Sequence, residues 1–211
     1  MKKTALSVLA VALTVALPLA GCNKKTEAPA SEVSQELPVA RKIDELIKKA
    51  EAGDTEAQVV LAEIFANGDG IPKDSTRAAD LFRKAAEKGT AKAQFRLGQM
   101  YVRGEGVPKD AVRAADLIKQ SASNGYAKGQ ALLGAMYAKG EGVTKDEVLA
   151  YAWSALAVTQ GEMDAKQTQD SVQLTTALHD EGERIKAKWK QGMALVREKE
   201  EKIVPVAPTK R

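Results

Sequence analysis

The chain has few of the residues that enzymes and metal proteins use most. Its 211 residues include one cysteine and one histidine, so neither a disulfide framework nor a Cys/His metal site is expected. His179 lacks the second histidine of an HExxH pattern, and the chain has no Gly-x-Ser-x-Gly, Ser-x-x-Lys or Walker sequence. We therefore predict no catalytic residue, no metal and no cofactor, and we expect His179 to be a solvated surface residue.

Aromatic side chains and excess charge are also scarce. Aromatic residues make up 4% of the chain. Without Lys2 and Lys3, the chain has 32 − 2 = 30 basic and 28 acidic residues. This balance does not indicate a nucleic-acid partner. Trp153 and Trp189 could be platforms for a carbohydrate or a peptide, but both stand at apolar positions of helical patterns. We expect them in the core.

The N-terminus has the three parts of a signal peptide in order. Lys2 and Lys3 precede an apolar run, residues 5–16, that is too short to span a bilayer permanently. The following Leu19-Ala20-Gly21-Cys22 resembles the bacterial lipobox, which implies cleavage after residue 21 and lipid, including palmitate, on Cys22. A free buried cysteine in a cytosolic protein is the alternative. Asn23 is not the aspartate that retains such lipoproteins in the inner membrane, so the resemblance implies the outer membrane, facing the periplasm.

Residues 22–37 should be a disordered tether. The stretch is polar, holds Pro29, Ser31 and Ser34, and has no aromatic residue. A tether of this kind would let the folded part stand away from the membrane.

One loop recurs three times at an interval of 36 residues. Each copy has the form Gly-acid-Gly, a β-branched residue, one further residue and Lys-Asp, and a fixed period of this length indicates a repeat protein. The first glycine suits the left-handed end of a helix, the second a tight turn, and the aspartate the N-cap of the next helix. These turn and cap positions are Gly68, Gly70, Asp74, Gly104, Gly106, Asp110, Gly140, Gly142 and Asp146.

Each repeat should contain two helices, which we call A and B. Apolar residues recur at three- and four-residue intervals, and large residues alternate with very small ones, as close-packed helix hairpins require. We therefore predict an all-α fold, an α-solenoid of stacked helix hairpins with repeats in residues 54–161. Residues 38–53 should form an N-terminal capping helix and residues 162–203 the C-terminal capping helices, followed by a tail, 204–211. The last helix should start at Thr175 or Thr176, with an apolar stripe of Leu178, Ile185, Trp189, Met193, Val196 and Ile203.

The pattern within one repeat is specific. Copy two reads Leu97-Gly98-x-x-Tyr101-x-x-Gly104-x-Gly106-Val107-x-x-Asp110-x-x-x-Ala114. It resembles the Sel1-like repeat family, which is related to the tetratricopeptide repeats. Departures are small and lie at Ala62, Ile118, Ser154 and Val158. The resemblance implies a scaffold that binds a peptide or protein partner.

The A helices should line a concave groove that receives the partner. Helical spacing directs nine residues toward it: Val59, Glu63, Lys92, Phe95, Gln99, Val102, Arg103, Lys128 and Lys139. Phe95 is either an exposed anchor for the partner or a residue packed between A helices. The leading hypothesis is therefore a membrane-anchored interaction scaffold of the bacterial cell envelope that is not an enzyme. The alternative is an envelope enzyme, or the cofactor of one, acting on peptidoglycan or exported polysaccharide.

Overall fold

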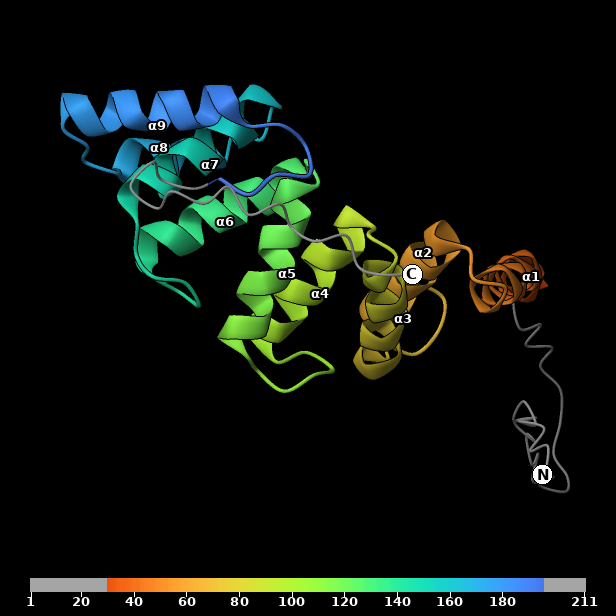
Figure 1. Ribbon diagram of the computed structural model, residues 1–211. Helices are drawn as coiled ribbons and strands as arrows, with labels where there is room; N and C mark the ends of the chain where they lie inside the picture. The colour runs from red at the N-terminus through yellow and green to blue at the C-terminus, as the bar shows by residue number, and fades with distance from the viewer. Residues whose placement is uncertain (1–29, 196–211) are drawn as a thin grey trace, which may run out of the picture.

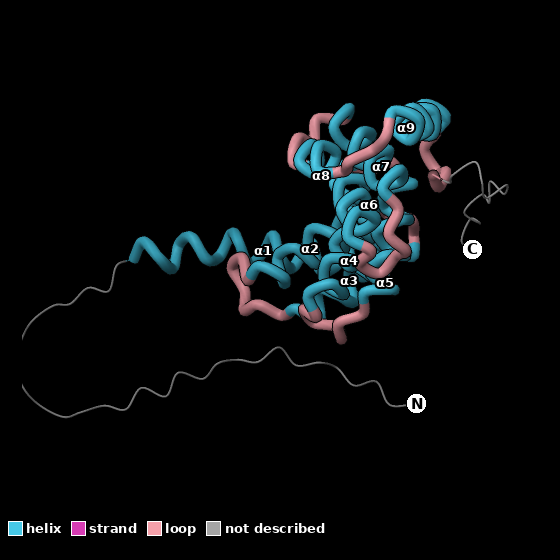
Figure 2. Tube along the Cα trace, turned by 90° about the vertical axis from the view of Figure 1, so that its left-hand side faces the viewer, coloured by secondary structure: helices cyan, strands magenta, loops and turns pink. Residues whose placement is uncertain are grey.

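Helix hairpins follow one another along the chain and stack side by side (Figure 1). The computed structural model describes residues 30–195, with side chains from residue 41. Over that range Figure 2 shows helices and loops and no strand, so the predicted all-α solenoid is confirmed. The helices are α1 (Ala30–Glu51), α2 (Thr55–Asn67), α3 (Ser75–Glu87), α4 (Ala91–Arg103), α5 (Ala111–Ser123), α6 (Ala127–Lys139), α7 (Glu147–Thr159), α8 (Ala165–Ser171) and α9 (Thr176–Lys188).

The A and B helices of the three repeats are α2/α3, α4/α5 and α6/α7. Each A helix ends in a left-handed glycine, with φ of 84°, 73° and 76° at Gly68, Gly104 and Gly140. Each B helix begins at an aspartate whose carboxylate accepts a backbone N–H of the first turn; Asp110, for example, accepts from Arg113 at 3.0 Å. Caps of this kind satisfy groups that a helix end leaves unpaired. The repeated loop therefore sets the length of both helices.

Small residues lie opposite large ones where the two helices of a repeat cross. A Cβ built on Gly98 would lie 2.7 Å from Cδ1 of Ile118, so glycine lets α4 approach α5 here without displacing that side chain. In the first repeat Ala62 and Phe82 occupy the same pair of positions, and both are buried. Matched volumes of this kind allow the hairpins to pack without voids.

A ladder of buried glutamines joins each A helix to the helix before it. Each Nε2 donates to the carbonyl eight residues earlier: Gln58 to Ala50 (3.0 Å), Gln94 to Ala86 (3.3 Å) and Gln130 to Ala122 (3.2 Å). The three side chains are at most 4% exposed. A buried carbonyl at a helix end thus gains a partner in every repeat.

The ends of the solenoid differ from the prediction. At the N-terminus α1 begins at Ala30 and not at residue 38, so residues 30–37, expected to be tether, are helical. This segment has no glycine, and its Glu, Gln, Ala and Leu favour a helix. The predicted lipidation site at Cys22 lies outside the described residues, as does the predicted tail, 204–211.

The last helix is shorter than predicted. It ends at Lys188 because the chain turns at Gly192 (φ 87°), whose N–H donates to the carbonyl of Ser123 at 2.6 Å. The turn brings Leu195 into the core and sets the ring of Trp189 edge-on to buried Trp153, with centroids 6.4 Å apart. Val196 and Ile203 of the predicted stripe lie outside the described residues. Within residues 30–195, no helix combines the length and the apolar character that a membrane crossing requires.

Candidate functional site

A cavity of about 300 Å³ opens between α4, α6 and the segment that leads into α8. Its lining is half apolar and half polar. We call the apolar residues the floor (Phe95, Ala131, Leu132, Ala135 and Ala165) and the polar residues the rim (Gln99, Lys128, Glu162, Asp164 and Thr168). This cavity therefore combines an apolar base with several polar groups, which is the usual make-up of a ligand site.

The cavity lies on the A-helix side of the solenoid, at its C-terminal end. Asp164 stands 36 residues after Lys128, and Thr168 stands 36 after Leu132. The short helix α8 thus occupies the place where the A helix of a fourth repeat would lie, and α4, α6 and α8 form three successive A positions. Because α8 has only seven residues, it leaves space beside α6.

Phe95 contributes to the floor of this cavity and is not an exposed anchor. Its side chain is 6% exposed, and its ring meets that of Tyr126 edge-on at a centroid distance of 5.3 Å. Val59, at the equivalent position one repeat earlier, is 5% exposed and packs in the core. Val59 was expected to face the partner, whereas for Phe95 packing between A helices was the stated alternative, and the structure shows that packing. Contacts with neighbouring helices, which helical periodicity does not reveal, bury both residues.

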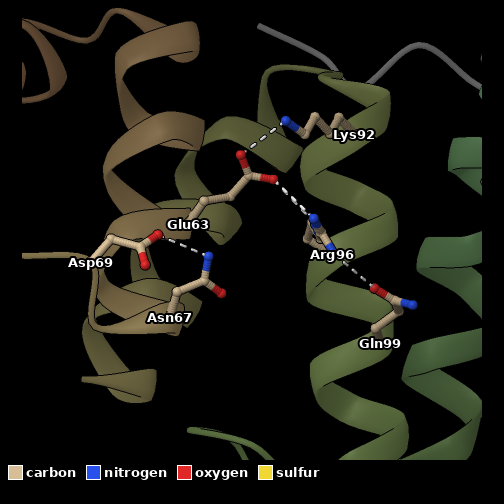
Figure 3. A network of polar contacts seen from close by, with 6 residues as sticks. All are labelled: Glu63, Asn67, Asp69, Lys92, Arg96 and Gln99. Atoms are coloured by element: carbon tan, nitrogen blue, oxygen red, sulfur yellow. Dashed lines mark hydrogen bonds and ion pairs between the residues drawn. The ribbon is translucent and has the colours of Figure 1, made fainter. Parts of the chain in front are cut away.

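A network of ion pairs crosses between the first two A helices. Glu63 of α2 directs its carboxylate at Lys92 and Arg96 of α4 (Figure 3), with N to O distances of 2.9 and 3.1 Å. Arg96 also approaches Oε1 of Gln99 at 3.5 Å. Three of these residues, Glu63, Lys92 and Gln99, were expected in a groove, but Glu63 and Lys92 form an ion pair with each other. Arg96 was missing from the prediction.

The next pair of A helices carries different residues at these positions. Thirty-six residues after Glu63, Lys92 and Arg96 stand Gln99, Lys128 and Leu132. An amide thus stands where the first interface has a carboxylate, and an apolar side chain stands where it has a guanidinium. Lys128 therefore does not have the counterion that Lys92 has. Among the described residues, the side chains of Lys128, Glu162 and Asp164 have no ion-pair or hydrogen-bond partner.

The remaining groove residues of the prediction lie away from the cavity. Val102 is half-buried and packs against the core of the first two repeats. Arg103 and Lys139 are exposed at the ends of α4 and α6, each 3.9 Å from a glutamate of the following loop. From the predicted set, the cavity is therefore lined by Phe95, Gln99 and Lys128.

A second polar cluster joins α9 to α7. The Tyr151 hydroxyl donates to Glu183 at 2.7 Å and lies 2.9 Å from Nε2 of His179, and Lys186 completes an ion pair with Glu183 at 2.5 Å. His179 was expected to be solvated; its side chain is about half exposed, but its ring has a tyrosine partner. Pairing between helices accounts for the difference.

This cluster shifts the pKa values of two of its members. Burial, followed by the hydrogen bond to Glu183, raises the pKa of Tyr151. Burial also acts to raise the pKa of Glu183, but hydrogen bonds from Lys186 and Tyr151 outweigh it, and that pKa is lowered. The cluster therefore favours the ionised form of Glu183 and links α9 to α7 through hydrogen bonds. In the part of the chain with described side chains, no group of three metal-ligating residues comes together.

Stacked two-helix units with a cavity on one face define a helical repeat protein of the α-solenoid class. The Sel1 repeat model matches residues 55–90, 91–126 and 127–162, and the chain belongs to the Sel1 repeat family. Sel1 repeats generally mediate protein–protein interactions and are generally non-enzymatic. Comparison with curated proteins returns no match.

Solved structures with the same fold include proteins of three bacteria. A Sel1 repeat protein from Oxalobacter formigenes is 38% identical over 62% of this chain and 98% of that one, with a TM-score of 0.57. The protective antigen c5321 of uropathogenic Escherichia coli, which displays an SLR fold, is 26% identical over 70% of this chain and 40% of its own, with a TM-score of 0.54. Helicobacter pylori cysteine rich protein B is 23% identical over 63% of this chain and 95% of its own, at a TM-score of 0.50, and shows the fold alone.

Sequence reasoning missed the acidic side of the cavity. Glu162 and Asp164 follow Gly161, at which we ended the repeats. Extending the 36-residue comparison beyond that glycine would have aligned Asp164 with Lys128 and revealed the change of charge.

Proposed function

We propose that this protein is a lipid-anchored interaction scaffold of the bacterial cell envelope. Lipid on Cys22 would hold it at the outer membrane, facing the periplasm, and the A-helix face would bind a segment of a protein partner. The general role of Sel1 repeats supports the scaffold, and the lipobox-like Leu19-Ala20-Gly21-Cys22 supports the anchor.

The cavity between α4, α6 and α8 carries this proposal. Its apolar floor can bury one or two side chains of a partner, while Gln99 on the rim can both donate to and accept from a peptide backbone. Such a combination of apolar contact and a few hydrogen bonds is how helical grooves hold peptides.

Site-specific photocrosslinking in living cells tests which face binds the partner. A photoreactive amino acid is placed at Gln99 of α4, on the cavity rim, or at Asp116 of α5, whose side chain is 63% exposed. We expect a discrete adduct from position 99 and none from position 116. Equal labelling from both positions would assign binding to another face.

A variant that fills the cavity provides the matched control. Ala135→Trp adds a large side chain to the half-buried floor, and Val112→Trp adds the same group at a position of α5 that is 63% exposed. The first should abolish the adduct from position 99 and the second should preserve it, with helicity unchanged in both. An adduct that survives Ala135→Trp contradicts binding in the cavity.

A further inference from the structure

The charges around the cavity define the chemistry of the bound segment. Glu162 and Asp164 contribute two carboxylates from one side and Lys128 one ammonium from the other, so the rim carries a net charge of one negative unit. All three lack a partner among the described residues. Charged groups that meet at a partly apolar cavity gain most from a ligand of complementary charge.

Comparison with the preceding interface shows that this arrangement is a departure within the repeat. Between α2 and α4, Glu63 forms ion pairs with both Lys92 and Arg96 and bridges the two helices. Between α4 and α6, Gln99 and Leu132 replace the first and last of these residues. Stacking the repeats does not require the replacements, since the first interface stacks with the charged set.

We infer that the cavity binds a partner segment in which an apolar side chain is followed directly by lysine or arginine. The inference rests on the proposed function and deepens it. The apolar side chain enters the floor formed by Phe95, Leu132 and Ala165. The basic side chain pairs with Glu162 and Asp164, and Lys128 and Gln99 donate to carbonyls of the bound backbone.

Two short peptides test the charge preference. The probes are dansyl-labelled, C-terminally amidated Gly-Gly-Leu-Arg-Gly and Gly-Gly-Leu-Glu-Gly, titrated with the full chain in detergent and followed by fluorescence anisotropy. We expect the arginine peptide to bind at least about tenfold more tightly, since one charge-assisted hydrogen bond raises an affinity by about that factor. Equal affinities, or no binding of either peptide, would overturn the inference.

Two double variants separate charge from shape. Glu162→Gln with Asp164→Asn keeps the size of both side chains and should make the two peptides bind alike. Gln99→Glu with Leu132→Arg gives the second interface the charged residues of the first, which should close the cavity and abolish binding of both peptides. An arginine preference that survives the neutral pair contradicts the assignment, even where the second variant fails to fold.

Other occupants produce distinct results. Binding of the arginine peptide only after deletion of residues 196–211 would show that the chain's own end fills the cavity. A dimer that the cavity-closing variant converts to a monomer would assign the site to a second copy. Either result overturns the inference. The proposed function stands if the adduct from position 99 persists while the peptide preference fails, and falls if both are lost.

Discussion

The second glycine of the repeated loop should connect one repeat to the next, and Gly106→Ala tests this. Gly106 has φ 69°, and a Cβ at this residue would overlap the carbonyl of Ser75, at the start of the preceding B helix, and lie 2.8 Å from N of Thr76. Gly142 stands in the same relation to Ala111, one repeat later. Glycine is therefore required both by the backbone angle and by contact between neighbouring repeats.

Gly89→Ala is the matched control. Gly89 has φ 84°, but a Cβ there would meet no atom within 4 Å. Left-handed backbone costs an alanine about 1–2 kcal/mol, and both variants bear that cost. In Gly106→Ala alone, the new Cβ also overlaps the backbone of Ser75, and moving that backbone adds about 1–3 kcal/mol to the loss of unfolding free energy. We therefore expect losses of unfolding free energy of roughly 1 kcal/mol for Gly89→Ala and roughly 3 kcal/mol for Gly106→Ala.

Urea unfolding followed by circular dichroism and by tryptophan fluorescence measures both losses. The difference between the variants reports the contact between repeats, because the backbone contribution cancels. Equal losses would refute the reasoning, since they would mean that the loop does not press on the preceding repeat.

Two further predictions follow from contacts described above, and a third from the lipobox-like sequence at Cys22. Phe95→Ala should lower the free energy of unfolding by about 3–5 kcal/mol in a thermal melt, because its ring is buried; an unchanged melting temperature would contradict this packing. Glu183→Gln should destabilise the chain at neutral pH. The folded-state pKa of Glu183 is lowered from 4.5, so its ionised form stabilises the fold above that pH, and the difference between wild type and variant should shrink as pH falls below it. A difference independent of pH would exclude this linkage. Cys22→Ser should remove palmitate labelling and shift the protein out of the membrane fraction; normal labelling of the variant would disprove the anchor.

Local sequence determined the repeat and its two helices. The period of 36 residues is visible in the sequence itself. The alternation of small and large residues and the Gly-acid-Gly loop are local patterns. All three features can therefore be recognised without knowing the tertiary structure. The cap at Asp110 and the left-handed end at Gly104 are examples. Each depends on the bonding preferences of one side chain or one backbone unit.

Tertiary structure alone decided which residues line the cavity and where the last helix ends. Periodicity places Phe95 on a face of its helix, but Tyr126 at the N-cap of α6 covers that face. The apolar stripe of the C-terminal helix could continue past Lys188, but the bond from Gly192 to Ser123 and the contact of Trp189 with Trp153 favour a turn. The cavity forms where the segment leading into α8 lies beside α6, and there Lys128, Glu162 and Asp164 have no partner among the residues that the structure describes. These outcomes depend on contacts between residues 30 or more positions apart, and such contacts arise only when the hairpins stack.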